Sequence, residues 1–321
     1  MTLLEVAVKA IRFITDLDVK PVRQVNRNIS TQTYRKSHLP TNAKNADNAV
    51  IKCSAQKSSV ATTHKYDYTK NGTLKRDLPN VSYVTSKPKE SILAKNDFVG
   101  NVISFSQIGS YHVKEKLNNQ DSVVSIGKIK MVVDGCGGEP YSEVGARIFT
   151  QLIKEEEPYI TEDNFVKAVS EIFERMTLLF NTDELIDKNL LFTIIACIET
   201  EDSYQVFCCG DGYIITYNGR HIDFIELNNG KYPHYFAYNY IKDKSTLGEY
   251  ANGMKFKLIT FPKSEFENIG VATDGLRFFY SLRDESQLYL LRALKNGNDK
   301  FVEKIIRSES STFADDITIC M

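Results

Sequence analysis

The stretch Asn118–Gly138, "NNQDSVVSIGKIKMVVDGCGG", decides how this chain folds. Two β-branched runs flank Gly127-Lys128, and this pattern predicts a β-hairpin with a two-residue turn of the Gly-X kind. In that register the numbers of paired residues sum to 255, so Asp121 lies directly opposite Asp134. Two carboxylates across a strand pair repel each other. A cation between them would relieve the repulsion, and so would a salt bridge to a nearby lysine.

The Asp-Gly step at Asp134 has an ordinary alternative, because such a step after an apolar strand is most often a simple hairpin turn. Two later segments favour a site. In "NIGVATDGL" (268–276) an apolar strand again ends in Asp-Gly, at Asp274, and in "STFADDITICM" (311–321) Asp315 and Asp316 precede the last strand. If these strands are antiparallel neighbours, Asp134, Asp274 and Asp315 could converge on one sheet edge. Oxygen ligands without His or Cys suit Mg²⁺ or Mn²⁺.

The composition is that of a globular domain, since 42% of the 321 residues are hydrophobic and 25% are charged. No run approaches the roughly 18 apolar residues of a membrane span. The first twenty residues lack the uninterrupted apolar stretch and cleavage site of a secretory signal. The six cysteines form no Cys-x-x-Cys pair, which indicates reduced thiols and a cytoplasmic protein.

Charge and hydrophobic patterning divide the chain into three parts. Residues 1–95 carry 17 Lys and Arg against 7 Asp and Glu, and the remaining residues carry 23 against 34. We expect an amphipathic helix over 1–18, a basic and mostly disordered linker over 19–95, and a folded domain over 96–321. The basic arm lacks any recognisable nucleic-acid-binding module, so nucleic acid is not an expected partner.

The folded part alternates groups of strands with pairs of helices. Nine strand-like runs lie between 102 and 321, and helical patterns lie near 142–155, 162–181, 284–295 and 298–308. Helices that come in pairs, not one after each strand, favour antiparallel sheets covered by helices. The expected fold class is therefore α+β.

An ordered set of motifs carries a resemblance to a known family. The motifs are "NQDS" (119–122), "VVDGCGG" (132–138), "SEVGA" (142–146), "GDG" (210–212), "ATDGL" (272–276) and "DDIT" (315–318). Over about residues 104–321 the chain resembles the metal-dependent protein phosphatases of the 2C family, in their bacterial-style branch. The resemblance implies a four-layer α/β-β/α sandwich, with two antiparallel sheets flanked by helix pairs. It also implies a serine/threonine phosphatase that acts on phosphorylated proteins, and we expect a monomer.

The resemblance assigns roles to particular residues. Two Mn²⁺ or Mg²⁺ ions would be bridged by Asp134, with the Gly135 carbonyl on the second ion and Asp274 and Asp315 completing the first site. Gln120 and Asp121 would hold metal-bound waters. A metal-activated hydroxide would then attack phosphorus in line. The residues expected to carry catalysis are Asp134, Asp121 and Lys116.

Departures from the family pattern leave some roles open. Lys116 stands where the family often has an arginine for the substrate phosphate, and lysine offers no bidentate fork. His112 is a second candidate for phosphate contact or for protonation of the leaving group, although a lone histidine is more often structural. The "LFT" at 191–193 replaces a usual Gly-Thr pair, so a third metal ion stays open.

Two alternatives also stay open. Asp211, in "CCGDGY", is expected to be a turn residue of the scaffold and not a metal ligand. The alternative to an enzyme is a catalytically weak or inactive 2C-like module that acts as a binding or regulatory protein.

Overall fold

The computed structural model describes residues 102–139, 141–227 and 233–321. The helix expected over 1–18 and the linker expected over 19–95 lie outside these residues. The domain expected over 96–321 is thus described from residue 102 onward. Among the described residues, no helix combines the length and the apolar character that crossing a membrane requires.

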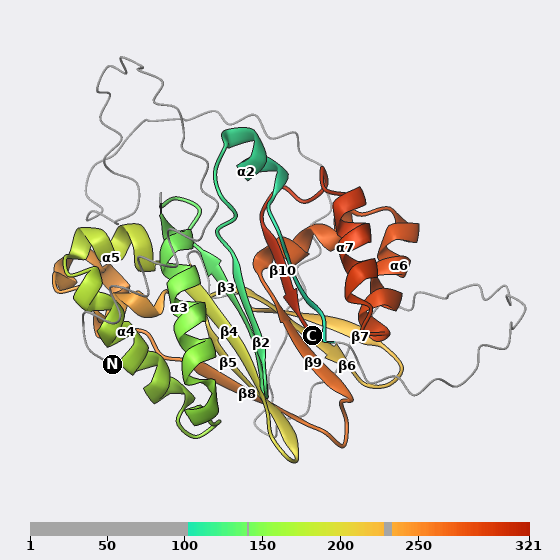
Figure 1. Cartoon of the computed structure of the whole chain (residues 1–321), viewed down its shortest axis with the longest axis horizontal. Helices are drawn as coiled ribbons and strands as arrows, with labels where there is room; N and C mark the ends of the chain where they lie inside the picture. The colour runs from blue at the N-terminus through green and yellow to red at the C-terminus, as the bar shows by residue number, and fades with distance from the viewer. Residues whose placement is uncertain (1–101, 140, 228–232) are drawn as a thin grey trace, which may run out of the picture. The chain divides into compact units, whose positions relative to one another are not determined.

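Two five-stranded antiparallel sheets form the centre of the domain (Figure 1). The first sheet has the order β1-β10-β9-β6-β7, with β1 Ser104–Gln107, β10 Ile317–Cys320, β9 Asn268–Ala272, β6 Gly212–Tyr217 and β7 Ile222–Leu227. The second has the order β2-β3-β4-β5-β8, with β2 Ser122–Ile126, β3 Ile129–Gly135, β4 Phe192–Glu199, β5 Ser203–Cys209 and β8 Lys257–Pro262. Nine of these strands match the predicted runs, and β7 was missed. It is an edge strand whose residues are mostly half-exposed, so it lacks a continuous apolar run.

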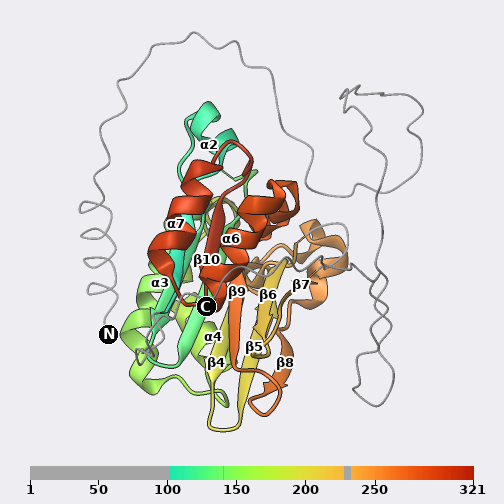
Figure 2. The ribbon, with the colours of Figure 1, turned by 90° about the vertical axis from the view of Figure 1, so that its right-hand side faces the viewer.

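Helices cover the outer face of each sheet (Figures 1 and 2). The β2-containing sheet packs against α3 Ser142–Glu156, α4 Phe165–Leu179 and the short α5 Asp183–Leu190, and the β1-containing sheet packs against α6 Asp284–Lys295 and α7 Asp299–Ser308. A third apolar cluster, which includes Val132, Ile195, Ile214 and Val271, fills the space between the sheets. Side chains alternate between faces along a strand, so each sheet can bury both. The predicted four-layer α+β sandwich is confirmed.

The helix expected from residue 162 begins later, at Phe165. The Asn164 side chain accepts a hydrogen bond from the backbone N–H of Thr161 at 2.8 Å, which holds the preceding residues in a turn. The remaining short elements are α2 Ser110–Glu115 and the 3₁₀ helices η1 Glu157–Tyr159, η2 Phe236–Asn239, η3 Lys244–Thr246, η4 Gly248–Asn252 and η5 Asp274–Ser281.

The β2–β3 hairpin has the predicted register. Ser122 pairs with Val133 and Ile126 pairs with Ile129, so the paired numbers sum to 255. Gly127 has φ +51°, a backbone conformation that favours glycine. The turn thereby brings Asp121, just before β2, level with Asp134 near the end of β3.

Candidate metal centre

Four aspartates line one small pocket of about 120 Å³. They come from distant parts of the sequence. Asp134 lies near the end of β3 and Asp211 in the β5–β6 connection, whereas Asp274 is the first residue of η5 and Asp315 lies just before β10. The pocket is lined by Asp134, Asp211, Asp274 and Asp315 together with Gly135, Cys136, Gly137, Thr193, Pro233 and Tyr235. The structure therefore brings together the three carboxylates that sequence analysis placed at one sheet edge, and it adds a fourth.

The antiparallel pairing of β9 with β10 places Asp274 beside Asp315. Val271 pairs with Cys320 and Ala272 with Ile319, so the end of one strand lies next to the start of the other. Gly275 lets the two backbones approach closely, because a Cβ there would lie only 2.9 Å from the carbonyl carbon of Asp316.

Gln120 and Asp121 are buried, at 4% and 5% exposure, next to residues that line the pocket. The Gln120 carbonyl accepts from the Gly135 N–H at 3.2 Å, and the charge of Asp121 acts on Asp134. The Gln120 amide nitrogen donates to Ser142 Oγ at 3.0 Å and to the Glu139 carbonyl at 3.1 Å. Asp121 Oδ2 accepts from the Thr273 hydroxyl at 2.8 Å. The other oxygen of each side chain, Gln120 Oε1 and Asp121 Oδ1, has no hydrogen-bond partner in the described protein. Two buried acceptors without a donor are what waters at a cation site would satisfy.

Asp316 has a different role from its neighbour Asp315. It is 3% exposed, and its carboxylate accepts from the backbone N–H groups of Gly109 at 2.7 Å and Gln120 at 2.6 Å. The His112 Nδ1 lies 2.9 Å from Asp316 Oδ1. Asp316 therefore ties the start of α2 and the approach to β2 to the final strand, and His112 is buried against it outside the pocket lining.

Lys116 lies at the C-cap of α2, exposed and with φ 61°. It is the only non-glycine residue with positive φ in the described part of the chain. Lys116 is not among the residues that line the pocket. Its expected contact with a substrate phosphate stays a prediction.

Burial, and after it the crowding of carboxylates, raises the pKa values of these aspartates. Burial is the main cause for Asp134, whose pKa lies well above the usual value, and the charges of Asp121, Asp274 and Asp315 raise it further. Burial likewise raises the pKa of Asp274 to about 6, against the lowering effect of Arg277, and raises that of Asp121. Because burial and repulsion disfavour the ionised form of these carboxylates, a bound cation would stabilise that form.

Arg277 supplies a positive charge at this site. Its guanidinium contacts Asp274 Oδ2 at 2.5 Å and Asp315 Oδ2 at 2.8 Å. In the described residues, no three His, Cys, Asp or Glu side chains stand in an arrangement that could hold a metal as it is. Sequence analysis did not single out Arg277.

Comparisons with known proteins identify the family. The model of the family described as protein phosphatase 2C matches residues 108–309. The chain belongs to the protein phosphatase 2C family. That classes it with the protein serine/threonine phosphatases. The match includes three of the four pocket aspartates, and Asp315 lies just beyond it.

Solved structures with a similar fold include bacterial phosphatases. The serine/threonine phosphatase Stp1 from Staphylococcus aureus is 14% identical, with 72% of this chain and 98% of that one covered and a TM-score of 0.48. The serine/threonine phosphatase PstP/Ppp from Mycobacterium tuberculosis is 14% identical, with 68% and 96% covered and a TM-score of 0.44. A PstP catalytic domain solved with two manganese ions is 13% identical, with 68% and 96% covered and a TM-score of 0.46. No curated protein matches the chain.

Asp211 of this phosphatase lies in a turn, as sequence analysis expected, and it also lines the pocket, which sequence analysis did not expect. The turn is tight, and Asp211 lies between Gly210 with φ +117° and Gly212 with φ +136°. That turn, however, joins β5 of one sheet to β6 of the other, and it directs Asp211 into the pocket lining. The signal was present in the sequence, because Asp211-Gly212 repeats the strand-then-Asp-Gly pattern of Asp134 and Asp274.

A tyrosine-rich segment of the phosphatase, residues 233–250, packs onto the domain. Tyr235 and Phe236 are buried in the cluster beneath α3 and α4, and the Tyr240 hydroxyl donates to the Ser170 carbonyl at 3.1 Å. Tyr235 also lines the pocket. The described tyrosines therefore anchor this segment and close one side of the site.

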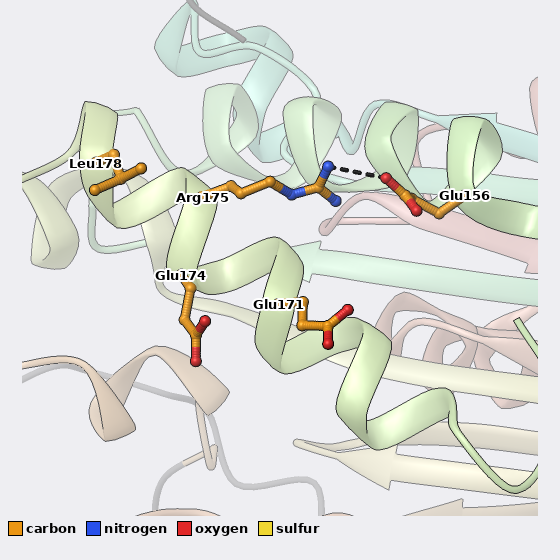
Figure 3. A pocket seen from close by; sticks show the side chains of 5 residues that line it. All are labelled: Glu156, Glu171, Glu174, Arg175 and Leu178. Carbon is orange, nitrogen blue, oxygen red and sulfur yellow. Dashed lines mark hydrogen bonds and ion pairs between the residues drawn. The ribbon is translucent and has the colours of Figure 1, made fainter. Parts of the chain in front are cut away.

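A larger hollow, of about 500 Å³, lies on the surface of the phosphatase beside α4 (Figure 3). It is lined by Glu156, Glu171, Glu174, Arg175 and Leu178. Arg175 is paired with Glu156 at 2.8 Å, whereas Glu171 and Glu174 point away from that pair (Figure 3). The acidic side chains of this hollow do not converge on one point. The smaller carboxylate pocket is therefore the better candidate for a metal or catalytic site.

Proposed function

We propose that this 2C-family phosphatase hydrolyses phosphoserine and phosphothreonine in phosphorylated proteins and depends on two divalent cations, Mn²⁺ or Mg²⁺. The observation that carries the proposal is the pocket of four aspartates. Beside it, Gln120 Oε1 and Asp121 Oδ1 are buried acceptors without a partner in the described residues. Family membership supplies the reaction class.

The residues present fit hard divalent cations. The pocket offers carboxylate and carbonyl oxygens, which Mg²⁺ and Mn²⁺ prefer. Asp134 and the Gly135 carbonyl would hold the ions together with Asp274 and Asp315. Asp211 lines the same pocket and is the described residue best placed to serve a further ion.

Bound divalent cations would supply a water of lowered pKa and neutralise charge on the phosphoryl oxygens. The protein's own groups then have defined tasks. Asp121 Oδ1 and Gln120 Oε1 can accept hydrogen bonds from water, which fixes the orientation of that water. The Thr273 hydroxyl donates to Asp121 Oδ2 and so fixes the orientation of the Asp121 carboxylate.

The two residues expected to hold the substrate phosphate, Lys116 and His112, lie outside the pocket lining. Lys116 is exposed and His112 is buried against Asp316. Of the two expected phosphate contacts, Lys116 is therefore the more accessible, and it would act as a point charge.

Asp134→Asn tests the proposal. Purified protein would be given a phosphoserine peptide with Mn²⁺, and phosphate release would be measured with and without EDTA. We expect EDTA to abolish phosphate release. Asp134→Asn should lower the rate of release by about 100-fold or more, since mutating even the residues that hydrogen-bond to metal ligands typically lowers metal affinity or activity 10- to 100-fold. Asp202→Asn is the matched control, because Asp202 is exposed in the β4–β5 turn at the opposite end of the sheet. Release that survives EDTA would contradict the metal dependence.

A non-catalytic binding module is the second candidate, and Arg277 favours it. The guanidinium occupies oxygens of Asp274 and Asp315 that a metal would need. Titration calorimetry with Mn²⁺ separates the two candidates, because the enzyme should bind two ions and the binding module should bind them poorly.

We also propose that the protein is a cytoplasmic monomer. Supporting the location, the five described cysteines are free thiols. Burial raises the pKa of Cys197 and of Cys208 to about 12, so these thiols are unreactive at neutral pH.

A further inference from the structure

Arg277 bridges two aspartates that belong to different elements. One guanidinium nitrogen contacts Asp274 Oδ2 at 2.5 Å and the other contacts Asp315 Oδ2 at 2.8 Å. Of the residues that line the pocket in the described part of the chain, four are Asp and none is Lys, Arg or His. The guanidinium thus reaches an acidic pocket from its edge.

Local structure fixes this arrangement. Asp274 and Arg277 lie on the 3₁₀ helix η5, in which side chains three residues apart eclipse each other. Arg277 therefore stands directly over Asp274. Because β10 pairs with β9, Asp315 lies beside the start of the same helix, and one planar guanidinium can span both carboxylates.

The bridge is accessible and therefore displaceable. The Arg277 side chain is 48% exposed, against 23% for Asp274 and 37% for Asp315. Its guanidinium also lies 5.1 Å from the centre of the Phe278 ring, a second favourable contact outside the pocket. The side chain can leave the carboxylates without becoming buried and unpaired.

We infer that Arg277 is a built-in competitor for the metal site, a positioning residue that holds Asp274 and Asp315 together in the metal-free protein and lowers the affinity for divalent cations. The inference rests on the proposed metal-dependent function. A divalent cation and the guanidinium need the same oxygens. The cation can also draw on Asp134 and Asp211, which the guanidinium does not contact in the described structure. Metal binding therefore displaces the guanidinium. The free energy of the Arg277 ion pairs is lost in the process, so the net free energy of metal binding is less favourable.

Three variants of the full chain test the inference. Arg277→Met keeps the length of the side chain and removes its charge. Arg277→Lys keeps the charge and removes the planar fork. Arg283→Met is the matched control, because Arg283 makes a similar exposed pair with Glu309 and does not line the pocket. Each metal-free protein would be titrated with Mn²⁺ in a calorimeter, and its melting temperature would be measured in EDTA and in Mn²⁺.

We expect Arg277→Met to bind Mn²⁺ about 10-fold more tightly than the wild type, the lower end of the range for hydrogen bonds between charged groups because the side chain is half-exposed. Arg277→Lys should also bind more tightly, by a smaller factor, and Arg283→Met should equal the wild type. In EDTA, Arg277→Met should melt below the wild type, since the carboxylates lose their counter-charge. In Mn²⁺ this deficit should disappear.

Distinct results would overturn distinct claims. If the wild type binds Mn²⁺ and Arg277→Met binds it equally or more weakly, the competitor role is wrong and the metal site stands. If only the Arg277 variants bind, the competitor role is supported in its strongest form. If no protein binds Mn²⁺, both the metal-dependent function and this inference fall. Should Arg277→Met fail to fold, affinity in Arg277→Lys decides, because a purely long-range charge effect would leave it at the wild-type value.

Discussion

Gly275→Ala is the sharpest perturbation of the candidate centre, because it adds one carbon at the point where β9 and β10 approach each other. A Cβ at this position would lie 2.9 Å from the Asp316 carbonyl carbon and closer still to the carbonyl oxygen. Ordinary contact begins near 3.4 Å, so the two segments must separate by at least 0.5 Å.

The neighbouring segment cannot yield easily. Asp316 is buried, and its carboxylate accepts hydrogen bonds from the backbone N–H groups of Gly109 and Gln120. Overpacking of this kind typically destabilises by about 1–3 kcal/mol. For a domain of this size that corresponds to a melting temperature lower by roughly 2–12 °C. The same displacement would move Asp274 away from Asp315 by more than the roughly 0.2 Å that metal-ligand distances tolerate.

Urea unfolding in EDTA and calorimetry with Mn²⁺ would measure the two effects. Gly137→Ala is the control, since a Cβ there would meet only Gln120 Oε1 at an ordinary 3.7 Å. We expect Gly275→Ala to lose both stability and Mn²⁺ affinity, and Gly137→Ala to retain its stability. A Gly275→Ala protein as stable as the wild type would refute the claim that this contact sets the spacing of the carboxylates.

Two further predictions concern the hydrogen bonds of Thr273 and the protonation of Asp274. Thr273→Val removes the hydroxyl that donates to Asp121 and accepts from the Thr318 N–H; chemical unfolding should show a loss of about 1–3 kcal/mol, whereas Thr216→Val, which loses only a 3.5 Å bond, should lie near the wild type. The pKa of Asp274 is raised by burial to about 6, so the folded state binds its proton more tightly than the unfolded state. In EDTA this group should therefore add about 1 kcal/mol of stability as pH falls from 7.5 to 5.5. In Mn²⁺ the trend should reverse because protons compete with the cation, and thermal melts with the same pH slope in both buffers would contradict this.

Sequence reasoning succeeded where local patterns determine structure. The hairpin register followed from Gly127-Lys128, because a two-residue turn fixes which residues face each other. The convergence of Asp134, Asp274 and Asp315 followed from strand polarity. Each deduction used only the alternation of a strand and the geometry of an antiparallel pair.

The residues that were missed depend on packing between elements. Asp211 lies in a turn that looks like a hairpin in the sequence, yet its two flanking strands belong to different sheets. Arg277 required knowing that residues 274–281 form a helix directly after β9, since side chains three residues apart on a helix are neighbours. Thr273 needed the distance between β9 and the start of β2, which no local pattern contains.

Two of the missed residues, Thr273 and Arg277, share a physical task, which is to hold together groups that repel each other. Burial and mutual repulsion raise the pKa values of Asp121, Asp134 and Asp274, so the pocket destabilises the fold when it carries its full negative charge. Thr273 offsets part of this with a hydrogen bond, and Arg277 offsets part with a charge. A divalent cation would replace the charge of Arg277 but not the bond of Thr273. It follows that metal should rescue the stability of an Arg277 variant and leave a Thr273 variant destabilised, so the two kinds of support can be told apart by adding Mn²⁺ alone.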